Sequence, residues 1–213
     1  MTADGRPVAK ASELIEEAAV VEAVAAHPWV GRGALKLSHA LDLWPVPVSG
    51  RVVLDVGAST GGFTEVCLRG GAARVYAVDV GRGQLHPRIA ADSRVVAMEA
   101  TDARDLTPAL IPEPPGLIVT DVSFISLEKA LPAALGLAAA GADLIALVKP
   151  QFEVGREHVG KGGLVTDAAA RSRALEAVRA FVEGQGWRVG EVADSPILGG
   201  DGAREFLLWA VRP

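Results

Sequence analysis

The segment LDVGASTGGF, residues Leu54–Phe63, places an apolar run, a glycine-rich turn and the start of a helical pattern in succession. Its core, GASTG, matches the G-x-S-x-G turn that raises a nucleophilic serine above a parallel sheet in hydrolases. The whole segment also matches a glycine-rich loop that wraps a nucleotide-like cofactor at a helix N-terminus. Both interpretations require a strand before the turn and a helix after it, so the segment predicts α/β structure and leaves the chemistry open.

Apolar, β-branched runs alternate with helical patterns from residue 50 onward. The runs predict seven strands, at Arg51–Val56, Arg74–Val80, Arg94–Met98, Leu117–Asp121, Leu144–Val148, Trp187–Val192 and Phe206–Val211. Their near-continuous apolar character suits strands buried on both faces of a mostly parallel sheet. Helices are predicted at Gly62–Arg69, Ser126–Ala140 and Asp167–Glu183, with Pro132 in the first turns of the second helix. This alternation predicts a doubly wound α/β fold.

The first 44 residues follow a different pattern. Residues 12–26, SELIEEAAVVEAVAA, fit a capped helix, although VVEAV within them fits a strand equally well. Residues 27–30, HPWV, read as a linker because Pro28 disfavours helix at His27. Residues 31–44, GRGALKLSHALDLW, predict a short amphipathic helix that places Lys36 just ahead of the sheet.

The bulk composition limits the class of protein. A length of 213 residues with 50% hydrophobic residues suits one domain with a short appendage. The longest apolar runs are too short to cross a bilayer, and no signal peptide opens the chain. The single cysteine, Cys67, suits a reducing cytosol and is expected to be an inert core thiol. The net charge of −5 weighs mildly against nucleic-acid binding, but a local basic patch can lie on an acidic protein.

The hydrolase interpretation of the glycine turn lacks its partners. In α/β-hydrolases several strands precede the nucleophile, whereas Ser59 follows the first predicted strand of this sheet. The histidines downstream of it, His86 and His158, lie in turn-rich stretches typical of surface loops. A nucleophilic Ser59 is therefore disfavoured.

The cofactor interpretation gains support from two aspartates. Asp79 ends the second strand about twenty residues beyond the glycines, where a carboxylate can accept hydrogen bonds from both hydroxyls of a ribose. Asp102 follows the third strand and is placed to meet an adenine edge. An adenosine-containing cofactor is expected, but these residues fit NAD and S-adenosylmethionine alike.

Four further polar residues lie where the predicted crevice should be. Lys36 precedes the sheet, Asp121 ends the fourth strand, Lys149 ends the fifth and Glu205 begins the last. The carboxyl ends of strands line the ligand crevice of a doubly wound sheet. A lysine in that position suits a base, because burial and neighbours can lower a lysine pKa to about 7–8.

Several longer motifs resemble one family. The stretches LDVGASTGGFTEVCLRGGAARVYAVDVGRGQL, TDVSFISL, LVKPQFEVG and REFLLW are similar to the TlyA (hemolysin A) family of FtsJ-like ribosomal RNA 2'-O-methyltransferases, over roughly residues 28–213. The resemblance implies a Rossmann-like class I methyltransferase fold with a seven-stranded, mostly parallel sheet flanked by helices. It also implies a Lys-Asp-Lys-Glu tetrad at Lys36, Asp121, Lys149 and Glu205.

The resemblance assigns the cofactor and its binding residues as well. S-adenosylmethionine would lie against the glycine loop, with Asp79 on its ribose, Asp102 on its adenine and Asp121 at the reacting end. The loop residues implied are Asp55, Gly57, Ala58, Ser59, Thr60, Gly61, Gly62 and Phe63. No metal is expected.

The implied reaction is methyl transfer to a ribose 2'-hydroxyl on a cytidine of ribosomal RNA in the cytoplasm. Lys149 as a neutral amine would take the hydroxyl proton while the oxygen attacks the sulfonium methyl in line. Asp121 and Glu205 would hold charge and orientation around Lys149, and Lys36 would contact RNA or steady developing negative charge. Alignment of this kind is worth up to about 7–11 kcal/mol in favourable intramolecular reactions.

The N-terminal residues depart from the family pattern. Family members begin with a small RNA-binding domain joined by an Arg-x-Trp-Val linker, where this chain has His27-Pro28-Trp29-Val30. We expect residues 1–30 to be a truncated remnant of that domain plus its linker, and residues 31–213 to be the FtsJ-like methyltransferase domain. Seven basic residues are expected to form a strip near the crevice: Arg32, Lys36, Arg82, Arg88, Lys149, Arg156 and Lys161.

The partner expected is RNA, with no membrane partner and with a monomer or weak homodimer as the assembly. Two alternative functions stay open. The same fold and cofactor would serve a methyltransferase that acts on small molecules. The older family name suggests a membrane-active hemolysin, but the sequence has no long amphipathic helix with the basic face that interfacial binding needs.

Overall fold

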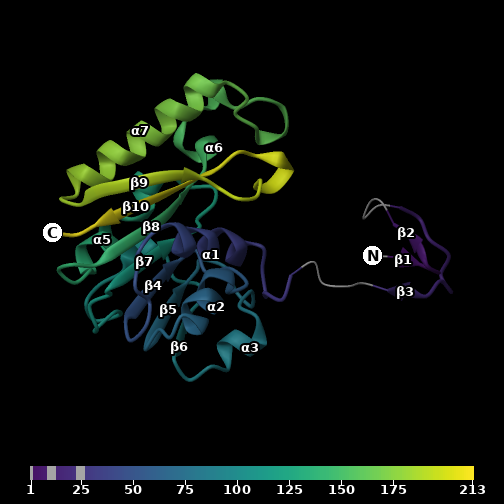
Figure 1. Cartoon of the computed structure of the whole chain (residues 1–213), viewed down its shortest axis with the longest axis horizontal. Coiled ribbons are helices and arrows are strands. Elements are labelled where there is room, and N and C mark those ends of the chain that lie inside the picture. Colours follow the sequence, from purple (N-terminus) through teal and green to yellow (C-terminus); the bar gives the residue numbers. More distant parts are fainter. Residues whose placement is uncertain (1, 9–12, 23–26) are drawn as a thin grey trace.

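The computed structural model describes residues 2–8, 13–22 and 27–213, and a seven-stranded sheet forms their centre (Figure 1). The sheet has the order β6-β5-β4-β7-β8-β10-β9. Its strands are β4 (Val52–Val56), β5 (Arg74–Val78), β6 (Val95–Met98), β7 (Leu117–Thr120), β8 (Asp143–Val148), β9 (Arg188–Asp194) and β10 (Phe206–Val211). Strands β4 to β8 pair in parallel, whereas β10 runs antiparallel to both β8 and β9. The Rossmann-like, mostly parallel sheet predicted from the sequence is confirmed.

Helices cover both faces of the sheet (Figure 1). They are α1 (Gly33–Leu43), α2 (Gly62–Arg69), α3 (Pro87–Ala90), α4 (Leu127–Ala130), α5 (Pro132–Leu137), α6 (Pro150–Glu153) and α7 (Ala168–Gly184), and η1 (Ala103–Asp105), η2 (Arg156–His158), η3 (Lys161–Gly163) and η4 (Gly200–Gly202) are short 3-10 turns. Successive strand residues point to opposite faces. Accordingly, Val53 packs in one core with α1, α2 and α3, while Leu54 packs in a second core with α4, α5 and α7. Cys67 lies fully buried in the first core, as expected for an inert thiol.

The strand register brings the functional residues to one edge of the sheet. Strands β4, β5 and β7 end side by side, because Val56 pairs with both Val78 and Thr120, while β8 extends two residues beyond Ala146, the partner of Thr120. Strand β10 begins at the same edge, where Phe206 pairs with Val148. The polar residues that follow or precede these strand ends therefore meet at the carboxyl edge, which is where ligands bind in open α/β sheets.

The predicted helix Ser126–Ala140 is wrong as a single element. Helix α4 ends at Ala130, Leu131 separates it from α5, and Pro132 is the first residue of α5. Proline has no backbone N–H to donate, and its ring conflicts with the preceding turn, so it starts a helix more readily than it continues one. Helix α5 then ends at Leu137, because Ala138 is extended.

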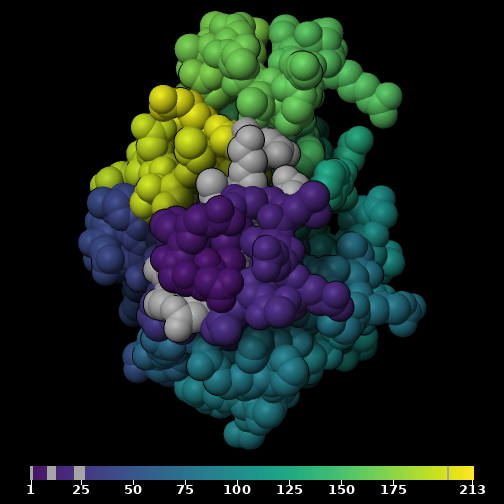
Figure 2. Space-filling view, turned by 90° about the vertical axis from the view of Figure 1, so that its right-hand side faces the viewer, coloured from purple at the N-terminus to yellow at the C-terminus, as the bar shows by residue number. Residues whose placement is uncertain are grey.

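The other predicted elements agree with the structure within two residues, apart from the first segment. Helix α7 begins after an Asp167 cap, whose carboxylate accepts hydrogen bonds from the amides of Ala169 and Ala170. At the N-terminus, β1 (Thr2–Ala3), β2 (Arg6–Pro7) and β3 (Val21–Glu22) form a small antiparallel sheet, which Figure 2 shows in purple. Of the two interpretations of residues 12–26, the strand is therefore correct at β3, while residues 12 and 23–26 lie outside the described chain.

Candidate active site

A cavity of about 530 Å³ opens at the carboxyl edge of β4, β5 and β7. This size lies within the range of about 300–1,000 Å³ typical of small-molecule and cofactor sites. Among the residues expected to bind the cofactor, those that line the cavity are Gly57, Ser59, Asp79, Asp102 and Asp121. The structure therefore brings together the glycine loop and the three strand-end aspartates that the sequence singled out separately.

The glycine loop reaches the cavity through strained backbone. Gly57 has φ +85° and Ser59 has φ +47°, both in the left-handed region. A Cβ atom on Gly57 would lie 2.9 Å from the backbone oxygen of Asp121, so the position requires glycine for its conformation and for close approach. The Ser59 amide donates to Asp79 Oδ2 at 2.8 Å and the Gly81 amide to Oδ1 at 2.7 Å, which fixes the Asp79 carboxylate at the cavity wall.

The remaining loop residues of the predicted cofactor set do not line the cavity. They are Asp55, Ala58, Thr60, Gly61, Gly62 and Phe63. Gly61 and Gly62 allow the start of α2 to pack closely, since a Cβ on Gly62 would lie 3.1 Å from the Ala34 amide of α1. Phe63 is a core residue between α1 and α2. These residues therefore support the loop on the side away from the cavity.

Asp55 is a fully buried carboxylate behind the loop. Its Oδ2 accepts a hydrogen bond from the Thr64 hydroxyl at 2.6 Å, and its Oδ1 has no hydrogen-bond partner in the described chain. Burial raises the pKa of Asp55 to about 7, the Thr64 hydrogen bond offsets part of the shift, and the nearby charge of Asp121 adds to it. Such a group favours a positively charged ligand near it, because a cation would stabilise its ionised form. The sulfonium and ammonium groups of S-adenosylmethionine fit this requirement.

Asp102 is held in its ionised form by a neighbouring arginine. The Arg104 guanidinium donates to both carboxylate oxygens, with the shortest contact at 2.5 Å. These hydrogen bonds lower the pKa of Asp102 to about 2. Asp102 lies in the cavity wall as expected, and any adenine edge that it accepts would share the carboxylate with Arg104.

The four tetrad residues form two ion pairs, of which Lys36–Glu205 is buried and Lys149–Asp121 is partly buried. Lys149 Nζ lies 2.6 Å from Asp121 Oδ1 and donates to Ser123 Oγ at 2.8 Å. Lys36 Nζ donates to Glu205 Oε2 at 2.5 Å. Lys36 and Lys149 are only 7% and 8% exposed. Lysines are almost never this buried unless they are paired.

Helix α1 joins the two pairs. Its fourth residue, Lys36, holds Glu205, while a Cβ on its first residue, Gly33, would lie 3.3 Å from Asp121 Oδ2. Register places Glu205 opposite Lys149, one step beyond the Phe206–Val148 pair. The structure therefore gathers all four side chains at one end of the sheet, beside the cavity that Asp121 lines.

Three residues near this cluster were missed by reasoning from strand ends. Ser123 accepts a hydrogen bond from Lys149. Phe124 has φ +66° and is 92% exposed at the cavity wall, with its ring centroid 5.2 Å from that of Phe152. Glu153 accepts a hydrogen bond from the Leu127 amide at 3.0 Å, and burial raises its pKa to about 7. Their signal lay in the motifs TDVSFISL and LVKPQFEVG, which contain these residues but do not reveal their roles.

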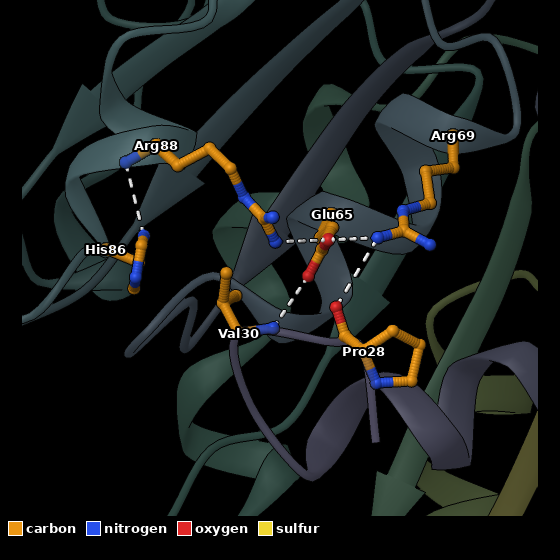
Figure 3. A network of polar contacts seen from close by, with 6 residues as sticks. All are labelled: Pro28, Val30, Glu65, Arg69, His86 and Arg88. Carbon is orange, nitrogen blue, oxygen red and sulfur yellow. Dashed lines mark hydrogen bonds and ion pairs between the residues drawn. The ribbon is translucent and has the colours of Figure 1, made fainter. Parts of the chain in front are cut away.

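A second polar network ties the linker to the glycine-loop helix (Figure 3). The buried Glu65 of α2 accepts hydrogen bonds from the Val30 amide and from the guanidinium groups of Arg69 and Arg88, each at 2.7 Å. The Arg69 guanidinium also lies 4.2 Å from the centre of the Trp29 ring. Because α2 starts at the cofactor loop, this network fastens residues 28–30 to the element that carries that loop.

The same network bears on two sequence interpretations. His86 Nδ1 accepts a hydrogen bond from the Arg88 amide and so caps α3 (Figure 3), which gives it a structural role rather than that of a base for Ser59. Within the expected basic strip, Arg88 is bound to Glu65 and Arg32 donates to the Leu198 carbonyl. With Lys36 and Lys149 paired as well, four of the seven basic side chains are engaged inside the protein.

Neither a metal site nor a membrane-spanning helix is found among the described residues. Over 2–8, 13–22 and 27–213, no group of three or more His, Cys, Asp or Glu side chains could hold a metal ion. In the same part of the chain, no helix has the length and apolar character needed to span a bilayer.

Known proteins resemble this chain over nearly its whole length. The sequence model of the FtsJ-like methyltransferase family matches residues 29–212. The 16S/23S rRNA (cytidine-2'-O)-methyltransferase TlyA of Mycobacterium tuberculosis is 47% identical over 208 residues, which cover 97% of this chain and 78% of that protein. A protein from Lactococcus lactis described as a hemolysin has a crystal structure with a TM-score of 0.84 and 41% identity, covering 87% of this chain and 89% of that one.

A more distant structure supports the fold alone. The magnesium protoporphyrin IX methyltransferase ChlM of Synechocystis, crystallised with S-adenosylhomocysteine, is 13% identical with a TM-score of 0.59. It covers 85% of this chain, and 82% of that chain is matched. The seven-stranded sheet described above is thus the fold of S-adenosylmethionine-dependent methyltransferases.

Proposed function

This chain belongs to the FtsJ-like methyltransferase family, and we propose that it transfers a methyl group from S-adenosylmethionine to the 2'-hydroxyl of a cytidine ribose in ribosomal RNA. The observation that carries the proposal is the convergence of the Lys149–Asp121 and Lys36–Glu205 pairs at the edge of the cofactor cavity. A cytoplasmic location follows from the acceptor. As its assembly we propose a monomer or weak homodimer.

The cofactor is held by the residues that line the cavity. S-adenosylmethionine supplies an electrophilic methyl group on a sulfonium. Asp79, fixed by two backbone amides, would accept the ribose hydroxyls, and Asp102 would accept from the adenine edge. Gly57 lets the backbone approach closely, and the buried Asp55 carboxylate favours the positive end of the molecule.

The reacting hydroxyl is a weak acid that needs a proton acceptor beside it. Lys149 Nζ donates a hydrogen bond to Ser123 Oγ and lies 2.6 Å from Asp121 Oδ1 in an ion pair. Once deprotonated, the amine would offer its lone pair to the 2'-hydroxyl and take its proton. Asp121 would orient the amine and offset its positive charge after transfer. The low exposure of the Lys149 side chain, about 10%, strengthens these interactions.

Two other groups would position the RNA. Glu205 lies next to Lys149 across the β8–β10 pair, and Lys36 neutralises it, so this carboxylate can orient a neighbouring group without repelling the RNA strongly. Phe124 offers an exposed ring one residue from Ser123. Unstacked RNA bases are commonly bound on aromatic faces of this kind.

The direct test is an acceptor assay with labelled S-adenosylmethionine. The purified chain is incubated separately with ribosomal subunits, naked ribosomal RNA and a mixture of cell metabolites, and RNA products are digested to nucleosides. Label on 2'-O-methylcytidine supports the proposal. Label confined to metabolites would assign a small-molecule methyltransferase, and lysis of lipid vesicles without cofactor would support the hemolysin alternative.

A further inference from the structure

A second cavity, of about 280 Å³, lies close to Lys149 along the chain, because Gln151 is among its lining residues. It is formed by the segment that leads into α7 and by the loop before β10. Its lining includes Gln151, Leu164, Val165, Thr166, Arg171 and Arg204. None of its lining residues is shared with the cofactor cavity, which is built from the ends of β4, β5 and β7. The two cavities are therefore separate sites.

We propose that this second cavity binds a backbone phosphate of the acceptor RNA strand, next to the nucleotide that is methylated. The inference rests on the proposed function, and it names how that RNA is held. Two covalent links place the cavity beside the reaction. Gln151 follows Lys149 by two residues, a span of at most about 7 Å, and Arg204 directly precedes Glu205.

The charge of the cavity suits an anion. Arg171 and Arg204 both line it, and no Asp or Glu of the described chain does. The Arg171 guanidinium is already oriented, because its Nη1 donates to the carbonyls of Val165 and Thr166 at 2.9 and 2.7 Å. Arg204 is exposed and makes no ion pair with any described residue. An arginine fork without an acidic partner matches the geometry of a phosphate.

The rest of the lining suits a sugar-phosphate unit. The Gln151 amide and the Thr166 hydroxyl can hydrogen-bond to phosphate or sugar oxygens, and Leu164 and Val165 give an apolar surface. The chain as a whole has a net charge of −5, so RNA must be attracted by a local basic site. Four of the basic residues expected near the crevice are bound within the protein, whereas Arg204 makes no ion pair with any described residue and directly precedes the tetrad residue Glu205.

The test compares Arg204→Gln with Arg188→Gln, which removes the same charge. Arg188 is exposed at the start of β9, paired with Val211 and therefore at the opposite edge of the sheet. We expect Arg204→Gln to raise the KM for the RNA acceptor at least about tenfold, as for the loss of a charge-assisted hydrogen bond. It should also reduce the salt slope of RNA binding by about 0.7, the value for one phosphate on a single strand. Arg188→Gln should change neither quantity.

A third variant and a cofactor measurement make the result decisive. Arg204→Lys keeps the charge and loses the fork, so it should retain the salt slope and recover part of the KM. Calorimetry should give all three variants the wild-type affinity for S-adenosylmethionine. An unchanged KM and salt slope in Arg204→Gln, with an active wild type, would overturn the inference alone, and so would a loss of cofactor affinity in that variant. If the wild type places no methyl group on RNA ribose, the proposed function itself fails.

Discussion

Asp55→Asn tests the electrostatics behind the cofactor loop. Asparagine keeps the size of the side chain and an oxygen that can accept from the Thr64 hydroxyl, but it cannot ionise. In the wild type, the pKa of Asp55 is about 7 in the folded protein, against 3.8 for an ordinary aspartate. The folded chain thus holds the proton more tightly than the unfolded chain does.

The sign and size of the effect follow from proton linkage. Asp55 contributes most to stability below pH 4, and this contribution is lost as the pH rises towards 7. Each pKa unit corresponds to about 1.4 kcal/mol, so the ionised carboxylate costs the folded state up to about 4 kcal/mol at pH 8. Between pH 5 and pH 8, the contribution of Asp55 to the free energy of unfolding changes by the equivalent of about two pKa units. Asp55→Asn should therefore gain about 3 kcal/mol of stability relative to the wild type over that range.

Urea unfolding of both proteins at pH 5, 6, 7 and 8 measures this difference. Glu153, whose pKa is also raised to about 7, contributes to both proteins and cancels in the comparison. The same substitution should weaken S-adenosylmethionine binding at pH 8, because it removes a negative charge that favours the sulfonium end. A free-energy difference that stays constant from pH 5 to pH 8 would refute the claim that burial holds this carboxylate against ionisation.

Two further substitutions test the loop and the second ion pair. Gly57→Ala should destabilise the protein by at least about 2 kcal/mol and abolish cofactor binding in calorimetry, because the new Cβ meets the Asp121 backbone. Gly50→Ala is the control, since Gly50 also has a positive φ but a Cβ there would lie in open space. It should cost only about 1–2 kcal/mol, for the left-handed conformation, and leave cofactor binding intact. Equal effects of the two would contradict the close-approach argument. Lys36→Met should cost about 3–5 kcal/mol in urea unfolding because it leaves Glu205 buried and uncompensated, and adding Glu205→Leu should recover most of that loss. Additive losses would show that the pair is not coupled.

The fold could be predicted because its pattern is local. Buried parallel strands are apolar along their whole length, so strands such as Leu117–Thr120 can be recognised in the sequence. The single predicted helix over 126–140 failed because the chain needed two short helices around Pro132 to cover the sheet. The residue pattern predicts that segment 126–140 is helical, whereas its packing on the sheet determines where the helix is interrupted.

Only the site residues that directly follow predicted strands could be located from the sequence. Asp79, Asp121 and Lys149 each follow a parallel strand, so the topology alone brings them to one edge. Which lysine pairs with which carboxylate depends on the position of α1 and on the β8–β10 register, and neither is encoded locally. The roles of Ser123 and Glu65 likewise arise from contacts between segments far apart in the chain.

The most direct test of the account is methyl transfer by Lys149→Ala, with Lys129→Ala, an exposed lysine of α4, as the control. Cofactor affinity is measured by calorimetry, and turnover is measured as 2'-O-methylcytidine formed on ribosomal RNA. We predict that Lys149→Ala lowers turnover by about 10²–10⁴-fold or more while its cofactor affinity stays near that of the wild type. Turnover of Lys149→Ala at the wild-type level, with Lys129→Ala equally active, would contradict the assignment of Lys149 as the group that accepts the ribose proton.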